Sequence, residues 1–326
     1  MNTGQRLPNA FLDTYGGLWS ATSAELSDEY SVGYLADGLR LQFIELLESE
    51  VIRAKVPNVQ VHVAILPRAD VRAFVWRDKR RRHEFVLAMQ IGTFEKFTEL
   101  LASADLWRPL MPRMKYLSRL VDADFRRLAV YMSVYAITCH ELAHIFRGHI
   151  DFLESLPRTD SSRMLEGRKL CEVDADRWGA FVLAGKVQMQ ASGISQQMLR
   201  SQVAVHDIAL EILTMLGAGL YRCYSLYNQV GTEHPSLYPH PFLRVANVTI
   251  GAADNLGLAD GLGQVRQRLA SVLTGMACAE EFAAQSTDLP QKAWDVASEL
   301  IGFERKFRAR LDAFSAELAP FSPARY

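Results

Sequence analysis

Apolar residues recur with a helical period over most of the chain. Residues 35–55 place apolar side chains at helical spacing without an internal proline, which predicts a helix. The same period returns at residue 93 and continues toward the C-terminus, with connectors at 106–117, 228–242 and 286–291. The pattern therefore predicts a mainly helical body.

Three short segments before residue 93 have a different pattern. Residues 59–66, 71–77 and 84–91 are rich in valine and aromatic residues, and turn-like residues separate them. They predict a small N-terminal sheet that is mostly antiparallel. Together with the helices, this sheet gives an expected fold class of α+β.

The order of these elements suggests three regions. Residues 1–110 contain the first helix and the sheet, residues 111–258 contain helices with the candidate chemistry, and residues 259–326 form a C-terminal helical region. No linker-like composition separates the first two regions. We therefore expect them to form one functional unit.

The charge balance gives no general attraction to polyanions. The 326 residues include 36 basic and 37 acidic ones, for a net charge of -1. The densest basic run, DKRRRH at 78–83, has no aromatic residues interleaved with it. A solvated hairpin tip is therefore favoured over a nucleic-acid site.

Other features predict a cytoplasmic protein without membrane spans. The longest apolar stretch, residues 212–221, is shorter than the roughly 20 residues that a membrane helix needs. The N-terminus lacks the basic and apolar segments of a secretory signal. The four cysteines are scattered and form no CxxC pair, which is typical of neither a disulfide framework nor a zinc knuckle.

One apolar helix contains a group of ionisable side chains. Residues 124–152 supply apolar surface around most of a predicted helix, and the stretch CHELAHIFRGH lies within it. His140 and His144 are one turn apart, within about 40° of the same face, so both imidazoles can bind one metal ion. Because burying such groups without partners is costly, the surroundings favour a metal site over a coincidental motif.

Glu141 lies about 100° further round this helix. From there its carboxylate is poorly placed to join the histidines as a ligand, but it can reach a water molecule at the metal. The residues favour one zinc ion, because catalytic zinc sites combine imidazole and carboxylate ligands with an open position. Glu141 is therefore the candidate general base.

A third ligand is predicted on the helix at 168–185. Glu172 and Asp176 are four residues apart on a largely apolar helix, so they share one face. Glu172 is expected to complete the site, and Asp176 to accept a hydrogen bond from a ligand histidine, His140 first. The alternative is that both carboxylates form ion pairs on a solvated face.

Three further residues are second choices as ligands. Glu166 has no acidic partner four residues on, and Asp174 projects roughly 200° from Glu172, toward solvent or an arginine. His149 projects about 140° from His144 if the helix continues. We therefore expect His149 to be solvated or locally hydrogen-bonded rather than a ligand.

The combination of HExxH on one helix and ExxxD on a following one resembles the gluzincin metallopeptidases. HELAH and CEVDADRWGA resemble soluble relatives of the CaaX prenyl endopeptidase family, and HELAHIFRGHIDFL resembles the Lit-type peptidases of phage exclusion in bacteria. The likeness covers residues 140–180. It implies a zincin-like fold with zinc ligands at His140, His144 and Glu172, a base at Glu141 and a supporting carboxylate at Asp176.

The resemblance also implies sites for the oxyanion and the substrate. Related peptidases have a His-Pro segment with a downstream arginine, and here His240 and His234 are the candidates, followed by Tyr238. Arg244 follows four residues after His240, and an ordinary loop is the alternative. An edge strand usually binds the substrate backbone, and residues 84–91 are the nearest candidate.

The sequence thus predicts a soluble zinc-dependent endopeptidase that acts without a covalent intermediate, and the resemblance to Lit-type peptidases implies that its substrate is an intracellular protein. The C-terminal helices at about 260–320, or an activating or inhibiting partner, are expected to gate the site. The alternative is a non-catalytic, metal-stabilised module that binds protein partners. Glu141 favours the enzyme, because structural zinc has no use for a general base.

Overall fold

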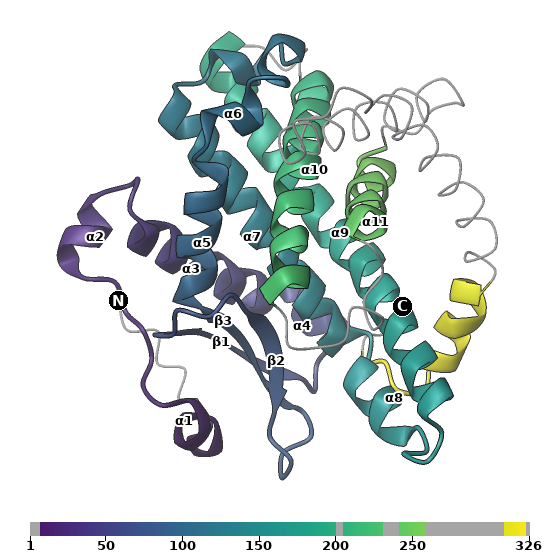
Figure 1. Ribbon diagram of the computed structural model, residues 1–326. Coiled ribbons are helices and arrows are strands. Elements are labelled where there is room, and N and C mark those ends of the chain that lie inside the picture. The colour runs from purple at the N-terminus through teal and green to yellow at the C-terminus, as the bar shows by residue number, and fades with distance from the viewer. Residues whose placement is uncertain (1–6, 200–204, 231–240, 258–309, 324–326) are drawn as a thin grey trace.

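The computed structural model describes residues 7–199, 205–230, 241–257 and 310–323. Helices dominate it, and a three-stranded sheet lies near the N-terminus (Figure 1). The expected α+β class with a mainly helical body is confirmed.

The elements follow the chain order of helices, sheet and helices. The strands are β1 (Gln60–Leu66), β2 (Ala73–Arg77) and β3 (Glu84–Gln90). The α-helices are α1 (Asn9–Tyr15), α2 (Ser23–Ser27), α3 (Val32–Glu48), α4 (Glu50–Lys55), α5 (Ile91–Leu101), α6 (Ala104–Trp107), α7 (Asp122–Phe146), α8 (His149–Ser155), α9 (Ser161–Leu199), α10 (Val205–Val230) and α11 (Pro241–Asn255). Two 3-10 turns, η1 (Met111–Arg113) and η2 (Leu117–Arg119), precede α7, and residues 310–318 are also helical.

The sheet is mixed, with the strand order β1-β3-β2. β2 and β3 pair antiparallel, but β1 pairs parallel with β3, so the expectation of a mostly antiparallel sheet is wrong for that pair. The reason is that β2, the next strand in the chain after β1, lies on the far side of β3. Short apolar runs identify strands but do not specify which strands become neighbours.

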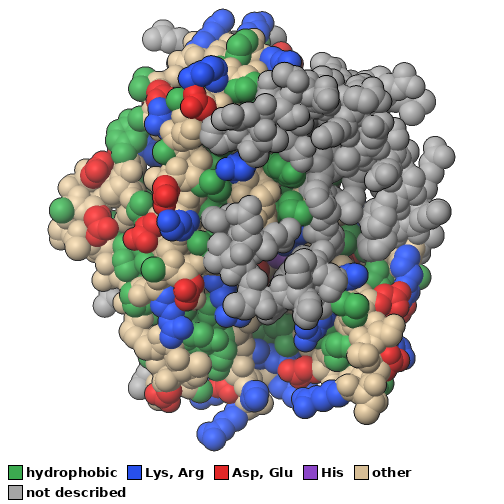
Figure 2. Space-filling model, in the orientation of Figure 1, with side chains coloured by type: hydrophobic (Ala, Val, Ile, Leu, Met, Phe, Trp, Pro, Cys, Tyr) green, Lys and Arg blue, Asp and Glu red, His purple; other side chains and the backbone are tan. Residues whose placement is uncertain are grey.

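The hairpin between β2 and β3 has an exposed tip. Residues 79–83 are all exposed, and basic side chains project from this part of the surface in Figure 2. The solvated hairpin tip that the sequence predicts is confirmed.

β3 is the central strand and is buried along its whole length. Leu87 and Met89 belong to the main hydrophobic core on one side of the sheet, and Val86 and Ala88 to a smaller cluster with α1 on the other. Because a central strand has no free backbone edge, the expectation that residues 84–91 form a substrate-binding edge is wrong. The two edges of the sheet are β1 and β2.

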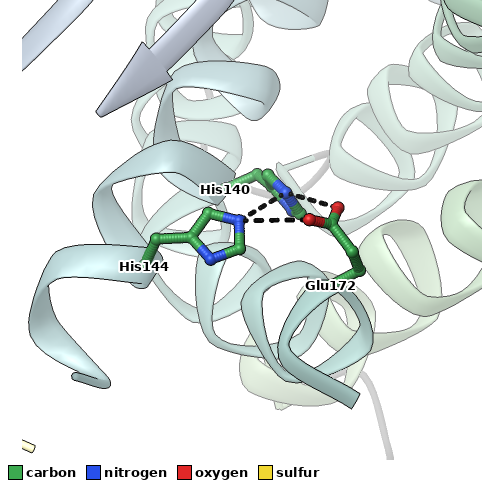
Figure 3. A group of neighbouring side chains, drawn as sticks. All are labelled: His140, His144 and Glu172. Atoms are coloured by element: carbon green, nitrogen blue, oxygen red, sulfur yellow. Dashed lines mark hydrogen bonds and ion pairs between the residues drawn. The ribbon is translucent and has the colours of Figure 1, made fainter. Parts of the chain in front are cut away.

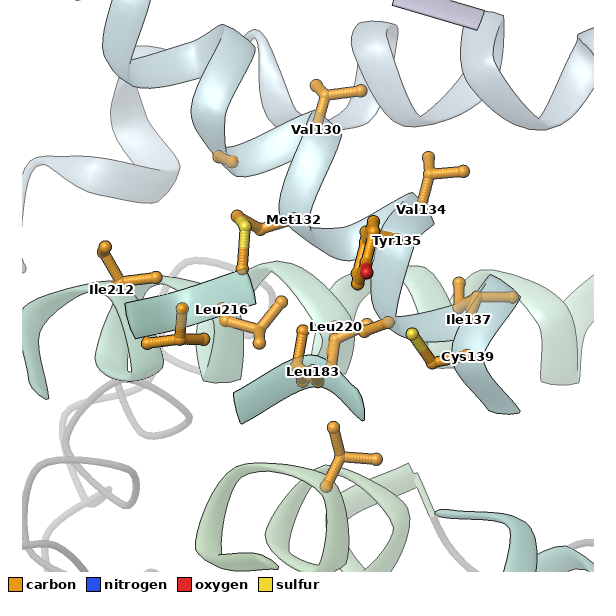
Figure 4. Packing of buried hydrophobic residues seen from close by; sticks show 14 of the residues in the cluster. Val130, Met132, Val134, Tyr135, Ile137, Cys139, Leu183, Ile212, Leu216 and Leu220 are labelled. Atoms are coloured by element: carbon orange, nitrogen blue, oxygen red, sulfur yellow. The ribbon is translucent and has the colours of Figure 1, made fainter. Parts of the chain in front are cut away.

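α7 is the central helix of the body. It packs against α5, α9 and α10, and most of its buried side chains belong to the main core. Figure 4 shows Met132 of α7 in the same cluster as Leu183 of α9 and Leu216 of α10. Burial of this apolar surface contributes about 25 cal/mol per Å², so the packing fixes the rotation of α7 and the directions of its side chains. The same core extends from Leu35 to Ala253 and therefore joins both sides of residue 110.

α7 ends at Phe146, before the end of the helix predicted at 124–152. Gly148 has a φ of 72°, in the left-handed region that glycine adopts without steric cost. A β-carbon at this position would lie only 2.1 Å from the carbonyl oxygen of Phe321. The break at Gly148 means that His149 does not continue the helical geometry of α7.

α9 has 39 residues and extends well beyond the predicted range of 168–185. It approaches α7 closely at Gly179, where a β-carbon would lie 3.1 Å from backbone atoms of Cys139 and His140. Glycine allows two backbones to approach in this way. This close approach sets the distance between the histidines of α7 and the carboxylates of α9.

The helix at 310–318 packs on α8 and α9 (Figure 1). Phe314 is fully buried there, in a separate cluster with Phe152 of α8 and Leu170 of α9. The rest of the predicted C-terminal region, up to residue 309, lies outside the described residues. None of the described helices combines the length and the apolar character that crossing a bilayer requires.

Candidate metal centre

Three predicted ligands converge between α7 and α9 (Figure 3). Nε2 of His140 lies 3.1 Å from Nε2 of His144 and 3.2 Å from Oε2 of Glu172. Nε2 of His144 lies 3.6 Å from Oε1 of Glu172. One ligand atom from each residue lies within 4.8 Å of the others, so this group could hold a metal ion.

The Glu172 carboxylate fits a bound cation. Its side chain is 15% exposed, and its buried Oε2 has Nε2 of His140 at 3.2 Å and Nη2 of Arg244 at 3.5 Å as ion-pair partners. Removing a charged oxygen from water without compensation is costly. A cation between the three side chains would add to the compensation that His140 and Arg244 supply.

Asp176 and Arg244 form hydrogen bonds on the Nδ1 side of the His140 ring. Nδ1 of His140 lies 2.7 Å from Oδ1 of Asp176, which is fully buried. Arg244 of α11 donates to both oxygens of Asp176, at 3.1 and 3.2 Å, and its guanidinium lies over the ring of Tyr224. Because Nδ1 of His140 donates to Asp176, the neutral form of this imidazole directs the lone pair of Nε2 into the group. Asp176 therefore lies where the sequence predicts it.

His149 contacts His144 on the opposite side of the group. It is fully buried, with Nδ1 2.8 Å from Nδ1 of His144 and Nε2 3.0 Å from Oδ2 of Asp174. The sequence predicts that His149 is either solvated or locally hydrogen-bonded. The structure shows the hydrogen-bonded arrangement. Asp174 is likewise buried, and it pairs with Arg147 at 2.7 Å rather than facing solvent.

Glu141 follows His140 and is partly buried. Burial is the main reason that the pKa of its carboxyl is raised to about 7, and the charge of Glu172 adds to this effect. His140 and Arg244 act in the opposite direction. A carboxyl with a pKa near 7 can both accept and release a proton near neutral pH.

The three ligands differ in their protonation. For His140, burial and Arg244 lower the pKa, but Asp176 and Glu172 outweigh them and raise it to about 9. Burial holds the pKa of His144 well below its usual range. Burial raises the pKa of Glu172, but His140, His144 and Arg244 outweigh it and hold that pKa well below its usual range. At pH 7 the metal-free group thus contains protonated His140, neutral His144 and ionised Glu172.

The predicted oxyanion residues His240 and His234, and also Tyr238, lie outside the described residues. Arg244, from the same segment of sequence, is buried in α11, and its Nη2 lies 3.5 Å from Oε2 of Glu172. The sequence pattern indicates this arginine only as a companion of the oxyanion residues. Its place among the apolar residues of α11 indicates burial, and a buried arginine requires a carboxylate partner.

Glu166, the rival third ligand, takes no part in the group. Its exposed carboxylate lies 3.2 Å from Nε of Arg310. The metal group therefore contains one carboxylate, from Glu172.

The likeness to gluzincins rests on residues 140–180 and stays an expectation. Comparisons of the chain with protein families, with curated proteins and with solved structures find no match.

Proposed function

We propose that this protein is a zinc-dependent endopeptidase of the gluzincin type. The observation that carries the proposal is the convergence of His140, His144 and Glu172, with Glu141 next to them on a buried helix. Three ligands and an adjacent carboxylate are the components of metal-assisted hydrolysis. A purely structural metal site would need no such carboxylate.

The kinds of donor atom in the group support zinc. The two imidazole Nε2 atoms lie 3.1 Å apart, and each faces a different oxygen of Glu172, at 3.2 Å from His140 and 3.6 Å from His144. One ligand atom from each residue lies within 4.8 Å of the others, close enough for a single ion. Two imidazoles and one carboxylate also leave a fourth position for water or substrate, as in catalytic zinc sites. We therefore expect one zinc ion per chain.

The side chains of the site have separate tasks in peptide hydrolysis. Bound zinc supplies Lewis acidity, which polarises a substrate carbonyl and makes water easier to deprotonate. Glu141 accepts a proton from the attacking water as the new carbon–oxygen bond forms. It then gives this proton to the amide nitrogen as the carbon–nitrogen bond breaks, which leaves a carboxyl group and an amine. Asp176 keeps the proton of His140 on Nδ1 throughout.

The outer edge of β2 is the proposed binding site for the substrate backbone. β2 is an edge strand, and α7 packs against it (Figure 1). An extended peptide at such an edge forms main-chain hydrogen bonds that do not depend on its sequence. Arg72, just before β2, lies near enough to Glu141 to lower the pKa of its carboxyl. This proximity supports a peptide path from β2 to the metal group.

The resemblance to Lit-type peptidases extends the proposal to a cytoplasmic protein target. A role in phage exclusion is the part of the proposal that rests on this resemblance alone.

The proposal is tested by mapping new peptide N-termini in a whole proteome treated with zinc-loaded protein. The wild type is expected to create termini that the Glu141→Gln variant does not create. If both forms bind zinc and neither creates new termini, the peptidase proposal fails. A non-catalytic protein-binding module then becomes the better explanation.

Zinc affinity is expected to rise with pH. A ligand imidazole must be neutral, whereas the pKa of about 9 keeps His140 protonated in the metal-free protein at neutral pH. Affinity should therefore increase by up to about tenfold per pH unit below pH 9. In NMR titrations, His140 should titrate near pH 9 without zinc and stay neutral from pH 6 to 9 with zinc. An affinity that is constant over this range would contradict the assignment of His140 as a ligand.

The Gly179→Ala substitution is expected to weaken zinc binding. The added methyl group would press on the backbone of Cys139 and His140 at 3.1 Å and move α9 away from α7. This overpacking costs about 1–3 kcal/mol, more than the roughly 1 kcal/mol that alanine gains over glycine in a helix.

Gly185→Ala is the matched control on the same helix. A β-carbon at Gly185 meets no other atom within 4 Å, so this variant should gain stability and keep its zinc affinity. Urea unfolding and chelator competition measure both effects. Equal zinc affinities of the two variants would show that the approach at Gly179 does not set the ligand spacing.

A further inference from the structure

A second hydrogen-bonded chain leads from His144 away from the metal group. It runs from Nδ1 of His144 to Nδ1 of His149 at 2.8 Å, and from Nε2 of His149 to Oδ2 of Asp174 at 3.0 Å. Arg147 completes the chain, with Nε 2.7 Å and Nη2 3.1 Å from the carboxylate oxygens of Asp174. His149, Asp174 and Arg147 are not members of the proposed ligand group.

The donors and acceptors of this chain determine where its protons lie. The Asp174 carboxylate, paired with Arg147, accepts hydrogen bonds, so Nε2 of His149 carries a hydrogen. A neutral imidazole has one donor and one acceptor nitrogen, which leaves Nδ1 of His149 as the acceptor. Nδ1 of His144 must then be the donor. His144 consequently directs the lone pair of Nε2 toward His140 and Glu172.

The C-terminal segment encloses this chain. The rings of Phe314 and His149 lie 6.5 Å apart, and His149 has no exposed surface. Oγ of Ser315 lies 3.2 Å from Nη2 of Arg147. Exclusion of water strengthens the hydrogen bonds of the chain and leaves its members few alternative partners. Residues 310–323 thus contact His149 and Arg147, although they are distant from both in sequence.

We propose that His149, Asp174 and Arg147 are positioning residues that fix the tautomer and the orientation of His144 as a zinc ligand. The inference rests on the proposed function, because it takes His144 to be a ligand. In this proposal, His149, Asp174 and Arg147 do for His144 what Asp176 and Arg244 do for His140. Loss of such an outer partner typically weakens metal binding by about 10–100-fold.

The test compares two substitutions of His149 in the full-length protein. His149→Leu removes the acceptor for Nδ1 of His144, whereas the side-chain oxygen of His149→Gln can accept the same hydrogen bond. The zinc Kd, measured by chelator competition, should rise about 10–100-fold in the leucine variant and recover largely in the glutamine variant. Histidine ¹⁵N NMR of the metal-free protein should show hydrogen only on Nδ1 of His144 in the wild type, and a mixture of tautomers in the leucine variant.

His62→Leu is the matched control for loss of a buried histidine. His62 is 1% exposed and its Nε2 lies 3.1 Å from Oε1 of Glu84, in the sheet rather than on the helices that carry the ligands. This variant should lose stability but keep the wild-type zinc Kd. If His149→Leu does not fold, Asp174→Leu provides the test, because it removes the acceptor for Nε2 of His149 and should also raise the zinc Kd.

Two results would overturn the inference: a wild-type zinc Kd in folded His149→Leu or Asp174→Leu protein, or a hydrogen on Nε2 of His144 in the metal-free wild type. These results do not depend on catalysis. A wild type that binds zinc and cleaves nothing would end the peptidase proposal, and the affinities and tautomers would still decide on the positioning chain.

Discussion

Replacing Glu141 with glutamine should abolish cleavage and leave the zinc content unchanged. The amide has almost the same size as the carboxylate but cannot accept the proton of the attacking water. Loss of a general base lowers the rate by about 10²–10⁴-fold. Because Glu141 is not among the three converging ligands, zinc should still bind. The measurements are kcat for a peptide that the wild type cleaves and the zinc content by mass spectrometry.

Glu166→Gln is the control for this experiment. Glu166 lies on the same helix as Glu172, but its side chain is 57% exposed and pairs with Arg310. The control should retain both its zinc and its activity. Cleavage at the wild-type rate by Glu141→Gln would exclude Glu141 as the base. Loss of zinc from that variant would instead indicate that Glu141 is a ligand.

Replacing Asp176 with alanine should strongly destabilise the protein and weaken zinc binding. Asp176 is fully buried and lies between His140 and the guanidinium of Arg244. Removal of one partner of a buried ion pair costs about 3–5 kcal/mol, because the other charge loses its compensation. His140 also loses the acceptor that keeps its proton on Nδ1, so zinc affinity should fall by about 10–100-fold.

Asp37→Ala provides the comparison for a partly exposed ion pair on a helix surface. Asp37 and Arg40 form a pair 2.8 Å apart, with 26% of each side chain exposed. Such pairs contribute about 0–1 kcal/mol, so this variant should unfold at nearly the wild-type urea concentration and bind zinc normally. If Asp176→Ala changes the unfolding midpoint and the zinc Kd as little as Asp37→Ala does, the Asp176–His140 contact contributes neither to stability nor to zinc binding.

The parts of the site that could be predicted are those that one helix determines by itself. His140 and His144 share a face because they are one turn apart, whatever surrounds the helix. Glu172 and Asp176 share a face of α9 for the same reason. That the two faces meet was an inference from two apolar helices with interrupting polar groups. Their separation depends on Gly179, whose role is visible only once α7 and α9 are packed.

The parts that could not be predicted depend on contacts between distant segments. The order of β1, β2 and β3 determines which strand is an edge, and alternation of side chains contains no information on that order. The direction of His149 depends on the break at Gly148 and on the C-terminal segment that packs there. Gly148 itself was a signal that the helix ends, because glycine is common just beyond helix C-termini.

For Asp174, the helical period predicts the direction of the side chain but not its burial. Its predicted direction, away from Glu172, agrees with its contact to Arg147. Its burial, however, results from packing around α8 and the helix at 310–318, which the periodicity of α9 does not reveal. A buried carboxylate that accepts hydrogen bonds from two residues has a structural role that a solvated one lacks.

The central claim, that two imidazoles and the Glu172 carboxylate bind one zinc ion, is tested most directly by anomalous diffraction at the zinc absorption edge. Crystals of the zinc-loaded protein should show one anomalous peak, about 2.0–2.2 Å from Nε2 of His140, Nε2 of His144 and a carboxylate oxygen of Glu172. A protein without such a peak, or a Glu172 side chain that points away from the two histidines, would contradict the claim.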